Sequence, residues 1–406
     1  MATVPQEIDD TSSLIYLDHA ATTPVRPEVL DAMLPYFNEA FGNPSSLYAI
    51  AGESRNAIDE ARARVASVLN CRTSEVVFTG GGTEADNMAL KGVASTFKEP
   101  GDIIISEIEH HAIIHAAEQL EKDGHHVVTV PVDRYGVVNP DHVCSRLGDR
   151  DAVVSIMYAN NEVGAVNDIS QISHLAKDHA RKNGTNVLLH TDAVQASGKL
   201  PLDVKALGVD LLSLSAHKIH GPKGVGVLHV RRGVKLDALI AGGGQERQRR
   251  SGTENVPGIV GMGLALALAE NERQQFCERT RALRDRFLAA VTERIPGVVV
   301  NNHPENCLPN IAHISVPGLE GEPMLLGLDF KGVCASSGSA CSSASVEPSH
   351  VLLGMGMSQE LAAGSLRFSF GKDSQDQDVD YAVDALSGVV NQLRGMPSMS
   401  AQPAAV

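Results

Sequence analysis

The chain has 406 residues, of which 43% are hydrophobic and 20% are charged, a composition typical of a folded protein with two or three domains rather than a disordered one. Its formal net charge of −15 makes it a poor partner for phosphate backbones, which argues against nucleic acid or an anionic membrane as primary partner. The chain has six cysteines, which are too sparse for a disulfide scaffold and are not spaced as zinc ligands, so we expect no intrinsic metal site. The N-terminus is polar and unlike a signal peptide, and together with the cysteine content it favours a cytoplasmic protein.

The first two-thirds of the sequence alternates short β-rich apolar runs with segments of helical periodicity. The predicted strands cover residues 76–79, 103–106, 127–130, 152–157, 187–190, 211–214 and 225–230. The predicted helices between them lie around 58–69 and over 84–97, 112–122 and 169–182. This alternation predicts a mostly parallel sheet with helices on both faces, and ligands beyond the carboxyl ends of its strands.

The pattern changes near residue 260. A helical stretch over residues 261–294 is a candidate spine between domains, and two further strands, a small-residue loop and a final helix follow it. These features predict a smaller α+β domain. The expected organisation is an N-terminal segment 1–25 packed on the domains, a large α/β domain 26–262, a small domain 263–396 and a frayed tail 397–406.

A glycine-rich segment follows the first strand of the predicted sheet. Gly80, Gly81 and Gly82 precede Thr83 at the start of a helix. Glycines let backbone N–H groups approach a ligand, and a helix N-terminus attracts phosphate. Taken alone, the segment fits a tight turn with Thr83 as helix N-cap equally well. It is not a Walker A loop, because no Gly-Lys-Ser/Thr follows at the required spacing.

Two later strands end in residues that could bind a cofactor with a pyridine ring and an aldehyde group. Asp192 ends one strand, where a carboxylate can hold a protonated ring nitrogen, although a helix N-cap is the simpler interpretation for that segment alone. The next strand delivers Ser215, His217 and Lys218 into a glycine-rich turn. A lysine leaving a buried strand suits a Schiff base, whereas a surface turn with solvated lysines is the alternative. A phosphate cup, an acid and a lysine on consecutive α/β units together favour pyridoxal phosphate.

With these motifs in place, the sequence resembles a cysteine desulfurase of the NifS/IscS type, in the class V aminotransferase group of fold-type I pyridoxal-phosphate enzymes. The resemblance runs from YLDHAATTP at 16–24 to about Gly371, and includes the motifs at 41–46, 109–110, 160–164, 250–253, 336–341 and 367–371. It implies a large domain with a mostly parallel sheet and a smaller α+β C-terminal domain.

The resemblance also implies how the cofactor would be held. Lys218 would form the Schiff base, Asp192 would pair with the ring nitrogen, and Gln195 would donate to the phenolate oxygen. His110 would stack on the ring and assist proton transfer. The residues implied for the phosphate are Gly82, Thr83, Ser215, His217 and, from the second subunit of a homodimer, Thr253.

The same resemblance assigns the substrate contacts and the sulfur-accepting residue. Asn161 and Arg367 would hold the carboxylate of L-cysteine. Cys341, in a Ser/Gly/Ala run typical of an exposed loop, would take the sulfur and leave L-alanine. An incidental cysteine is the alternative interpretation, and Cys334 is interpreted as a small buried apolar residue.

The resulting persulfide would pass to an acceptor such as an iron–sulfur scaffold, and Cys341 is also a candidate transient cluster ligand. Selenocysteine lyase is the nearest alternative function. An aminotransferase, another β-eliminating lyase and a non-catalytic assembly scaffold are less favoured alternatives. The sequence leaves the sulfur acceptor and its pathway open.

Overall fold

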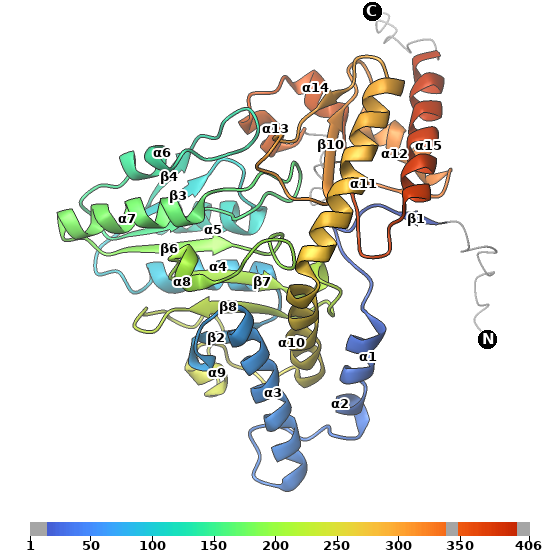
Figure 1. The fold of residues 1–406 in the computed structure, drawn as a ribbon. Helices are drawn as coiled ribbons and strands as arrows, with labels where there is room; N and C mark the ends of the chain where they lie inside the picture. The colour runs from blue at the N-terminus through green and yellow to red at the C-terminus, as the bar shows by residue number, and fades with distance from the viewer. Residues whose placement is uncertain (1–13, 338–347, 396–406) are drawn as a thin grey trace, which may run out of the picture.

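A seven-stranded sheet organises the computed structural model, which describes residues 14–337 and 348–395 (Figure 1). The strand order is β2-β8-β7-β6-β5-β3-β4, and β8 alone in this sheet runs antiparallel to its neighbours. The strands are β2 (Val76–Thr79), β3 (Asp102–Ser106), β4 (His126–Val130), β5 (Ala152–Ser155), β6 (Val187–Asp192), β7 (Leu211–Ser215) and β8 (Gly226–Val230). The predicted mostly parallel α/β sheet is thereby confirmed, with small shifts at the strand ends.

Helices cover both faces of this sheet. One face packs on α4 (Gly82–Ala94) and α5 (His111–Lys122) through side chains such as Val153 and Leu188. The next residues along the same strands, Val154 and Leu189, face the opposite core with α3 (Ala49–Val68), α7 (Ile169–Asn183) and α10 (Val256–Asn271). Because both alternating faces are buried, the strands read as continuous apolar runs.

Short helices complete the large domain. They are α1 (Pro27–Met33), α2 (Pro35–Asn38), η2 (Thr73–Glu75), α6 (Pro140–Ser145), α8 (Val204–Leu207), η3 (Ala216–Lys218) and α9 (Gln245–Gln248). Of these, η3 matters most for the site, because it follows β7 directly and carries Lys218 at its end.

The smaller domain has its own core around three antiparallel strands in the order β12-β10-β9. Its strands are β9 (Val299–Val300), β10 (Ile311–Ser315) and β12 (Ser365–Ser369), and its helices are α11 (Arg273–Arg294), α12 (Gly321–Asp329), α13 (His350–Gly354), α14 (Gln359–Ala363) and α15 (Asp376–Gly395). The N-terminal β1 (Ile15–Tyr16) pairs in parallel with β11 (Val333–Cys334), and Leu17 is buried in the same core. The N-terminal segment therefore joins the small domain before it crosses to the large one.

The helical stretch predicted over residues 261–294 is two consecutive helices, α10 and α11, which meet at Glu272. Helix α10 packs against α3 and α1 of the large domain, whereas α11 packs against α15 and β10 of the small domain (Figure 1). Arg26 makes two hydrogen bonds of 2.8 Å to the Glu272 carboxylate at this junction. We propose that the domain boundary lies at Glu272, C-terminal to the predicted boundary after residue 262.

Candidate active site

A cavity of about 440 Å³ lies at the carboxyl ends of β6 and β7, beside the first turns of α4 and α5. It brings together the predicted residues Gly82, Thr83, His110, Asn161, Asp192, Gln195, Ser215, His217, Lys218 and Arg367. Thr253 is exposed and does not line the cavity, and its predicted role concerns a second subunit. Cys341 lies outside the described residues. The wall thus draws on segments far apart in the sequence.

The start of α4 forms an anion-sized cup at one end of the cavity. Gly81 is the N-cap residue, and its φ of 153° is accessible mainly to glycine. A Cβ on Gly82 would lie 3.0 Å from Val194 Cγ2 and 3.5 Å from Ser215 Cβ, so a side chain there would fill the cup. Thr83 lies inside the first helical turn. The alternative interpretation of Thr83 as the N-cap is therefore wrong.

The N-terminal segment holds the turn that carries Lys218. Lys218 Nζ donates hydrogen bonds of 2.6 Å to the carbonyl oxygens of both Ala20 and Ala21. The Thr23 amide donates to the His217 carbonyl at 2.9 Å, and the His220 amide donates to Thr23 Oγ1 at 2.7 Å. These contacts give a physical role to the 16–24 motif, to which the sequence analysis assigns no function.

Asp192 is a buried carboxylate, and its pKa is set by burial on one side and by a hydrogen bond and a nearby positive charge on the other. Burial raises its pKa to about 6, while the Val194 N–H, which donates to Oδ1 at 2.8 Å, and the charge of Lys218 act in the opposite direction. Asp86, on α4, lines the same cavity, and burial followed by the charge of Asp192 holds its pKa well above the usual range. Asp192 is therefore the ionised acid of the pair near neutral pH.

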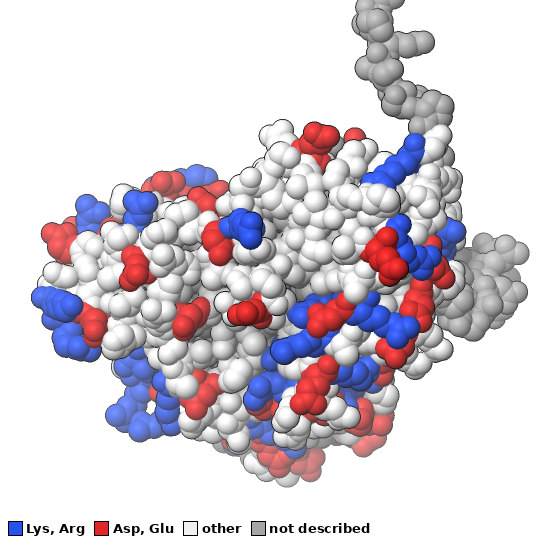
Figure 2. All heavy atoms as spheres, turned by 45° about the horizontal axis from the view of Figure 1, so that its top comes forward, with Lys and Arg blue, Asp and Glu red and all other residues white. Residues whose placement is uncertain are grey.

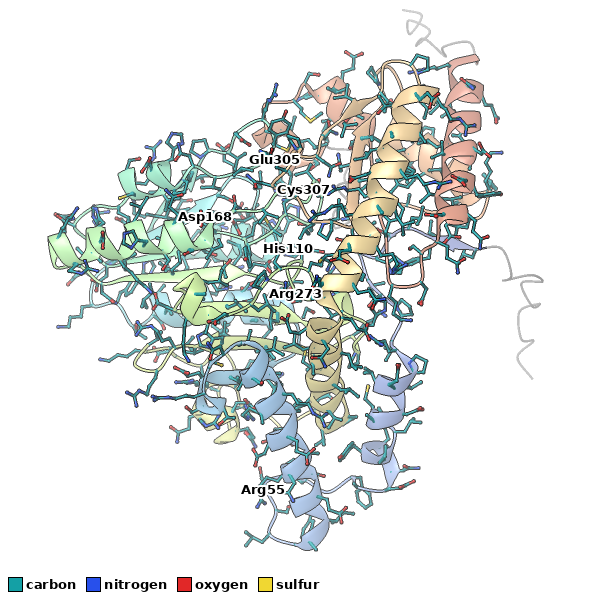
Figure 3. All side chains as sticks on the ribbon, in the orientation of Figure 1. Arg55, His110, Asp168, Arg273, Glu305 and Cys307 are labelled. Carbon is teal, nitrogen blue, oxygen red and sulfur yellow. The ribbon has the colours of Figure 1, made fainter. Side chains whose placement is uncertain are left out.

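His110 is the N-cap of α5 and lies between the sheet and the small domain (Figure 3). Its Nδ1 accepts a hydrogen bond from the Ala112 N–H at 3.1 Å. Burial, with a smaller contribution from the charge of Lys218, lowers the pKa of His110 to about 4. The imidazole is consequently neutral at physiological pH, with its proton on Nε2.

Arg367 is 2% exposed and lies on β12, so the small domain contributes its guanidinium to the cavity. Nη2 donates to Asp18 Oδ1 at 2.7 Å, and Nη1 donates to the Asn161 carbonyl at 2.8 Å. Within the described ranges, Arg367 Nε is buried without a hydrogen-bond partner. The sequence analysis did not identify Asp18, which fixes the guanidinium from a position 349 residues away.

A second buried acid, Glu109, lies next to His110 in the sequence. Its Oε1 accepts hydrogen bonds from Ser106 Oγ at 2.5 Å and from the Met157 N–H at 2.9 Å. Burial raises the pKa of Glu109 to about 8 in spite of these bonds. The side chain is therefore mostly protonated at neutral pH.

We expect Glu109→Gln to change how stability depends on pH. Between an ordinary pKa of 4.5 and the folded value of about 8, the folded chain holds a proton that the unfolded chain releases. The wild type should therefore lose stability as pH rises through this window, by up to about 1 kcal/mol per pH unit. Glutamine has no such proton, so the melting temperature of the variant should rise relative to wild type between about pH 5 and 8. Thermal unfolding of the two cofactor-free proteins measures this effect. A difference in melting temperature that stays the same from about pH 5 to 8 would contradict a raised pKa for Glu109.

On the face of the molecule shown in Figure 2, acidic and basic side chains are interspersed, and neither sign of charge forms a large patch. Over residues 14–337 and 348–395, no helix combines the length and apolar character needed to cross a membrane. The same residues contain no group of three or more His, Cys, Asp or Glu side chains placed to hold a metal ion.

Comparison with known proteins agrees with the geometry of the cavity. Residues 15–382 match the family model described as aminotransferase class-V. The chain is 46% identical over 396 residues to "Cysteine desulfurase IscS" of Methanosarcina thermophila, covering 97% of this chain and 96% of the relative.

Solved structures give the same result. A "NifS-like protein" matches with a TM-score of 0.87 and 36% identity, over 93% of this chain and all of the other. "SspA in complex with cysteine" matches with a TM-score of 0.76 and 33% identity, over 87% of this chain and 98% of the other.

Proposed function

The chain belongs to the class-V aminotransferase family and is a cysteine desulfurase, and from this premise we propose that its main cavity binds pyridoxal phosphate and L-cysteine. The observation that carries this assignment is the convergence of Lys218, Asp192, His110 and Arg367 on one cavity. The solved relative that binds cysteine supports L-cysteine as the substrate.

The residues of the cavity fit the cofactor. Gly82 and Thr83, with Ser215 and His217, would hold the phosphate, since all four line the cavity and the first turn of α4 presents backbone N–H groups there. Gln195 Oε1 is buried and lacks a hydrogen-bond partner among the described residues, while its Nε2 donates to the Ala20 carbonyl at 2.9 Å. The unpaired atom is an acceptor, so Gln195 would donate to the phenolate oxygen of the ring only with its amide turned over, which brings Nε2 to the cavity.

Each catalytic group has one task in this proposal. When bound, pyridoxal phosphate supplies a sink for the electron pair left at the substrate Cα. Asp192, ionised near neutral pH, keeps the ring nitrogen protonated. Lys218 Nζ anchors the cofactor and, once released, takes the Cα proton. His110, neutral with its proton on Nε2, would donate that proton.

Arg367 would orient the substrate carboxylate. Two of its nitrogens are fixed by Asp18 and by the Asn161 carbonyl, so the guanidinium is held in place before the substrate arrives. This fixed orientation reduces the entropy that binding has to remove. Asn161 lines the cavity beside Arg367 and would contact the same carboxylate.

The sulfur step would use Cys341. Its thiolate would attack the substrate sulfur, breaking the Cβ–S bond as the new S–S bond forms, and a proton would then complete L-alanine at Cβ. L-cysteine and the enzyme thiol are thus converted to L-alanine and an enzyme persulfide. An acceptor such as an iron–sulfur scaffold would remove this sulfur in the cytoplasm, a compartment that keeps the acceptor cysteine as a free thiol.

We place a homodimer contact on the arm that α1, α2 and the start of α3 form. Large apolar side chains are exposed along this one stretch, at Leu34, Phe37, Phe41, Leu47 and Tyr48, and Leu47 is 99% exposed. A run of exposed, large apolar side chains of this kind is typical of an interface, and a second copy of the chain would cover it. Thr253, exposed and outside its own cavity, would then reach the partner's phosphate.

The function is tested by following products from L-cysteine with the purified, cofactor-loaded enzyme and a thiol reductant. We expect equal amounts of L-alanine and sulfide, and no amino transfer to an added keto acid. Transfer to the keto acid would indicate an aminotransferase instead. A kcat/KM at least tenfold higher on selenocysteine than on cysteine would favour the selenocysteine lyase alternative, and no reaction with either substrate would favour the scaffold alternative.

A further inference from the structure

A second, much smaller cavity of about 40 Å³ lies behind Lys218. Lys218 lines both this space and the main cavity. The rear space is also lined by Lys199, His19, His220 and Asn310. Asn310 Oδ1 and His19 Nδ1 are buried, and neither atom has a hydrogen-bond partner in the part of the chain that the structure describes.

Lys199 is the unusual member of this wall, because lysine is rarely buried without a carboxylate partner. It is 8% exposed, and its Nζ donates one long hydrogen bond of 3.3 Å to the Ser197 carbonyl. No Asp or Glu within residues 14–337 or 348–395 lies at ion-pair distance from it. Burial, followed by the charge of Lys218, lowers the pKa of Lys199 to about 8. It therefore remains largely charged at neutral pH.

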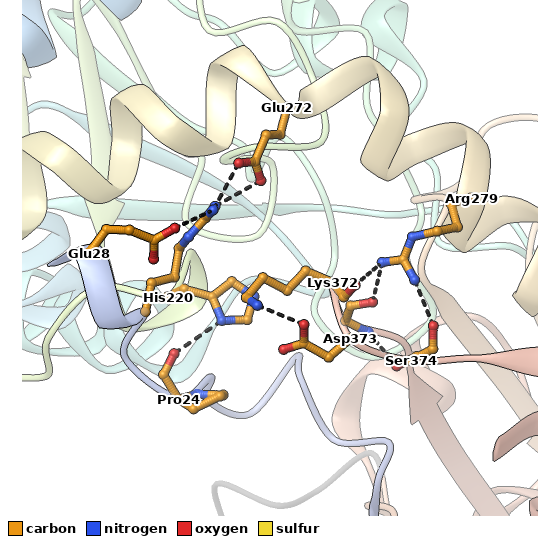
Figure 4. Close-up of polar contacts among 10 residues, drawn as sticks. Pro24, Glu28, His220, Glu272, Arg279, Lys372, Asp373 and Ser374 are labelled. Carbon is orange, nitrogen blue, oxygen red and sulfur yellow. Dashed lines mark hydrogen bonds and ion pairs between the residues drawn. The ribbon is translucent and has the colours of Figure 1, made fainter. Parts of the chain in front are cut away.

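The other charges at the rim are paired with one another. Arg26 binds Glu272, and Lys372 binds Asp373 at 2.7 Å, as part of a polar cluster that joins the two domains (Figure 4). Arg279 in the same cluster donates to the Gly371 and Ser374 carbonyls. These exposed or half-buried pairs largely cancel, and water screens them.

The remaining titratable groups near the rear cavity are neutral. Burial lowers the pKa values of His19 and His220 to about 4. Burial also raises the pKa of the Cys277 thiol, which donates to the Lys199 carbonyl at 3.2 Å. Lys199 is consequently the one unpaired buried charge that the described residues place on this side of Lys218.

On the opposite side, Lys218 faces the main cavity. His110 and His217 are neutral there, because burial lowers the pKa of each to about 4. Asp192 supplies a negative charge that favours the ammonium form of Lys218. The carboxylate and the buried ammonium of Lys199 therefore act on Lys218 in opposite directions.

We propose that Lys199 is a positioning residue whose buried positive charge favours the neutral amine of Lys218. Two like charges in a space of low polarity raise each other's free energy, so the second amine gives up its proton more readily. The neutral amine is the form that bonds to an aldehyde and removes a proton from substrate. The inference rests on the proposed role of Lys218 as the cofactor-binding lysine.

The test compares Lys199→Met, which removes the charge, with Lys199→Arg, which keeps it. The visible absorption of the lysine-bound cofactor is titrated with pH for each holoenzyme. We expect the Met variant to titrate about one pH unit higher than wild type, and the Arg variant to stay close to wild type. Lys205→Met, at an exposed position of α8, is the matched control and should not move the midpoint.

A second readout uses the cofactor-free protein. Added pyridoxal phosphate should bond to Lys218 about tenfold more slowly at pH 7 in Lys199→Met, because less neutral amine is present, and the rate should recover at high pH. A purely structural role would slow the reaction at every pH. Lys199→Gln replaces the Met variant if the latter does not fold.

Two outcomes overturn the inference: an unchanged midpoint in Lys199→Met, or equal shifts in the Met and Arg variants. Lys218→Ala separates this failure from that of the proposed function. If Lys218→Ala keeps a covalently bound cofactor, the proposed function fails. If it loses the cofactor bond while Lys199→Met titrates as wild type, only the role of Lys199 fails.

Discussion

Lys218→Ala is expected to abolish turnover of L-cysteine and the visible absorption of lysine-bound cofactor. The substitution removes both the amine that anchors the cofactor and the base that takes the Cα proton. Loss of a positioned base alone costs roughly 10²- to 10⁴-fold in rate, and loss of the covalent anchor adds to it. We therefore expect kcat to fall by on the order of 10³-fold or more.

Absorbance spectra and an alanine assay on the same preparations measure both effects. Lys205→Ala is the matched control, because Lys205 is exposed on α8 and does not line the main cavity. It should keep the covalent cofactor and most of the activity. Lys218 also bonds to the Ala20 and Ala21 carbonyls, so the melting temperature of the variant should be compared as well. A Lys218→Ala protein that still shows the band of lysine-bound cofactor would contradict the assignment.

The sheet could be predicted because each of its strands is marked by the apolar residues of that strand alone. Strands β3 and β5 contain short, continuous apolar runs, at residues 103–105 and 152–154, because both faces of these strands are buried in separate cores. The polar residues that end β6 and β7, Asp192 and Ser215, must then meet at one edge of a parallel sheet. Strand pattern and chain order alone therefore predicted most of the cavity.

Contacts between distant segments could not be predicted in this way. The carbonyls of Ala20 and Ala21 carry no sequence signal, yet they hold Lys218 across nearly 200 residues, with separations of 198 and 197 positions. Asp18 fixes Arg367 in a similar way. A periodic pattern reports burial of one segment, but not which backbone atom of another segment approaches it.

Two buried charged residues did leave a weak signal. Lys199 is the one charged residue between Asp192 and Asp203, in a stretch of small and apolar residues, and a lysine in such a context needs a reason. Asp86 likewise lies between an alanine and the largely apolar later turns of α4, in which Lys91 is the one charged residue. In both cases the signal indicated burial only, and for Lys199 the neighbouring cavity supplies the proposed role.

Cys341→Ser is expected to remove persulfide formation while leaving the cofactor bound. The change replaces one sulfur with oxygen, and a serine hydroxyl can neither form the S–S bond nor ionise near neutral pH. None of the five described cysteines lines the main cavity. Burial holds the pKa of Cys71, Cys277, Cys307 and Cys334 above the ordinary value, with that of Cys71 at about 12. These four are therefore thiols at neutral pH. Because none of the five described cysteines, Cys144 included, lines the main cavity, Cys341 is the favoured acceptor.

Cys334→Ser is the matched control for this prediction. Cys334 lies on β11, half-buried, and precedes Cys341 by only seven positions. Because it pairs with the N-terminal strand and does not line the cavity, its substitution should leave alanine formation within about twofold of wild type. For Cys341→Ser we expect alanine formation below about 1% of wild type, because no other nucleophile replaces the thiolate. Mass spectrometry of the protein after brief exposure to L-cysteine should show one added sulfur in wild type and Cys334→Ser, and none in Cys341→Ser. Added sulfur on the Cys341→Ser protein would move the acceptor to another cysteine and overturn the proposed sulfur step.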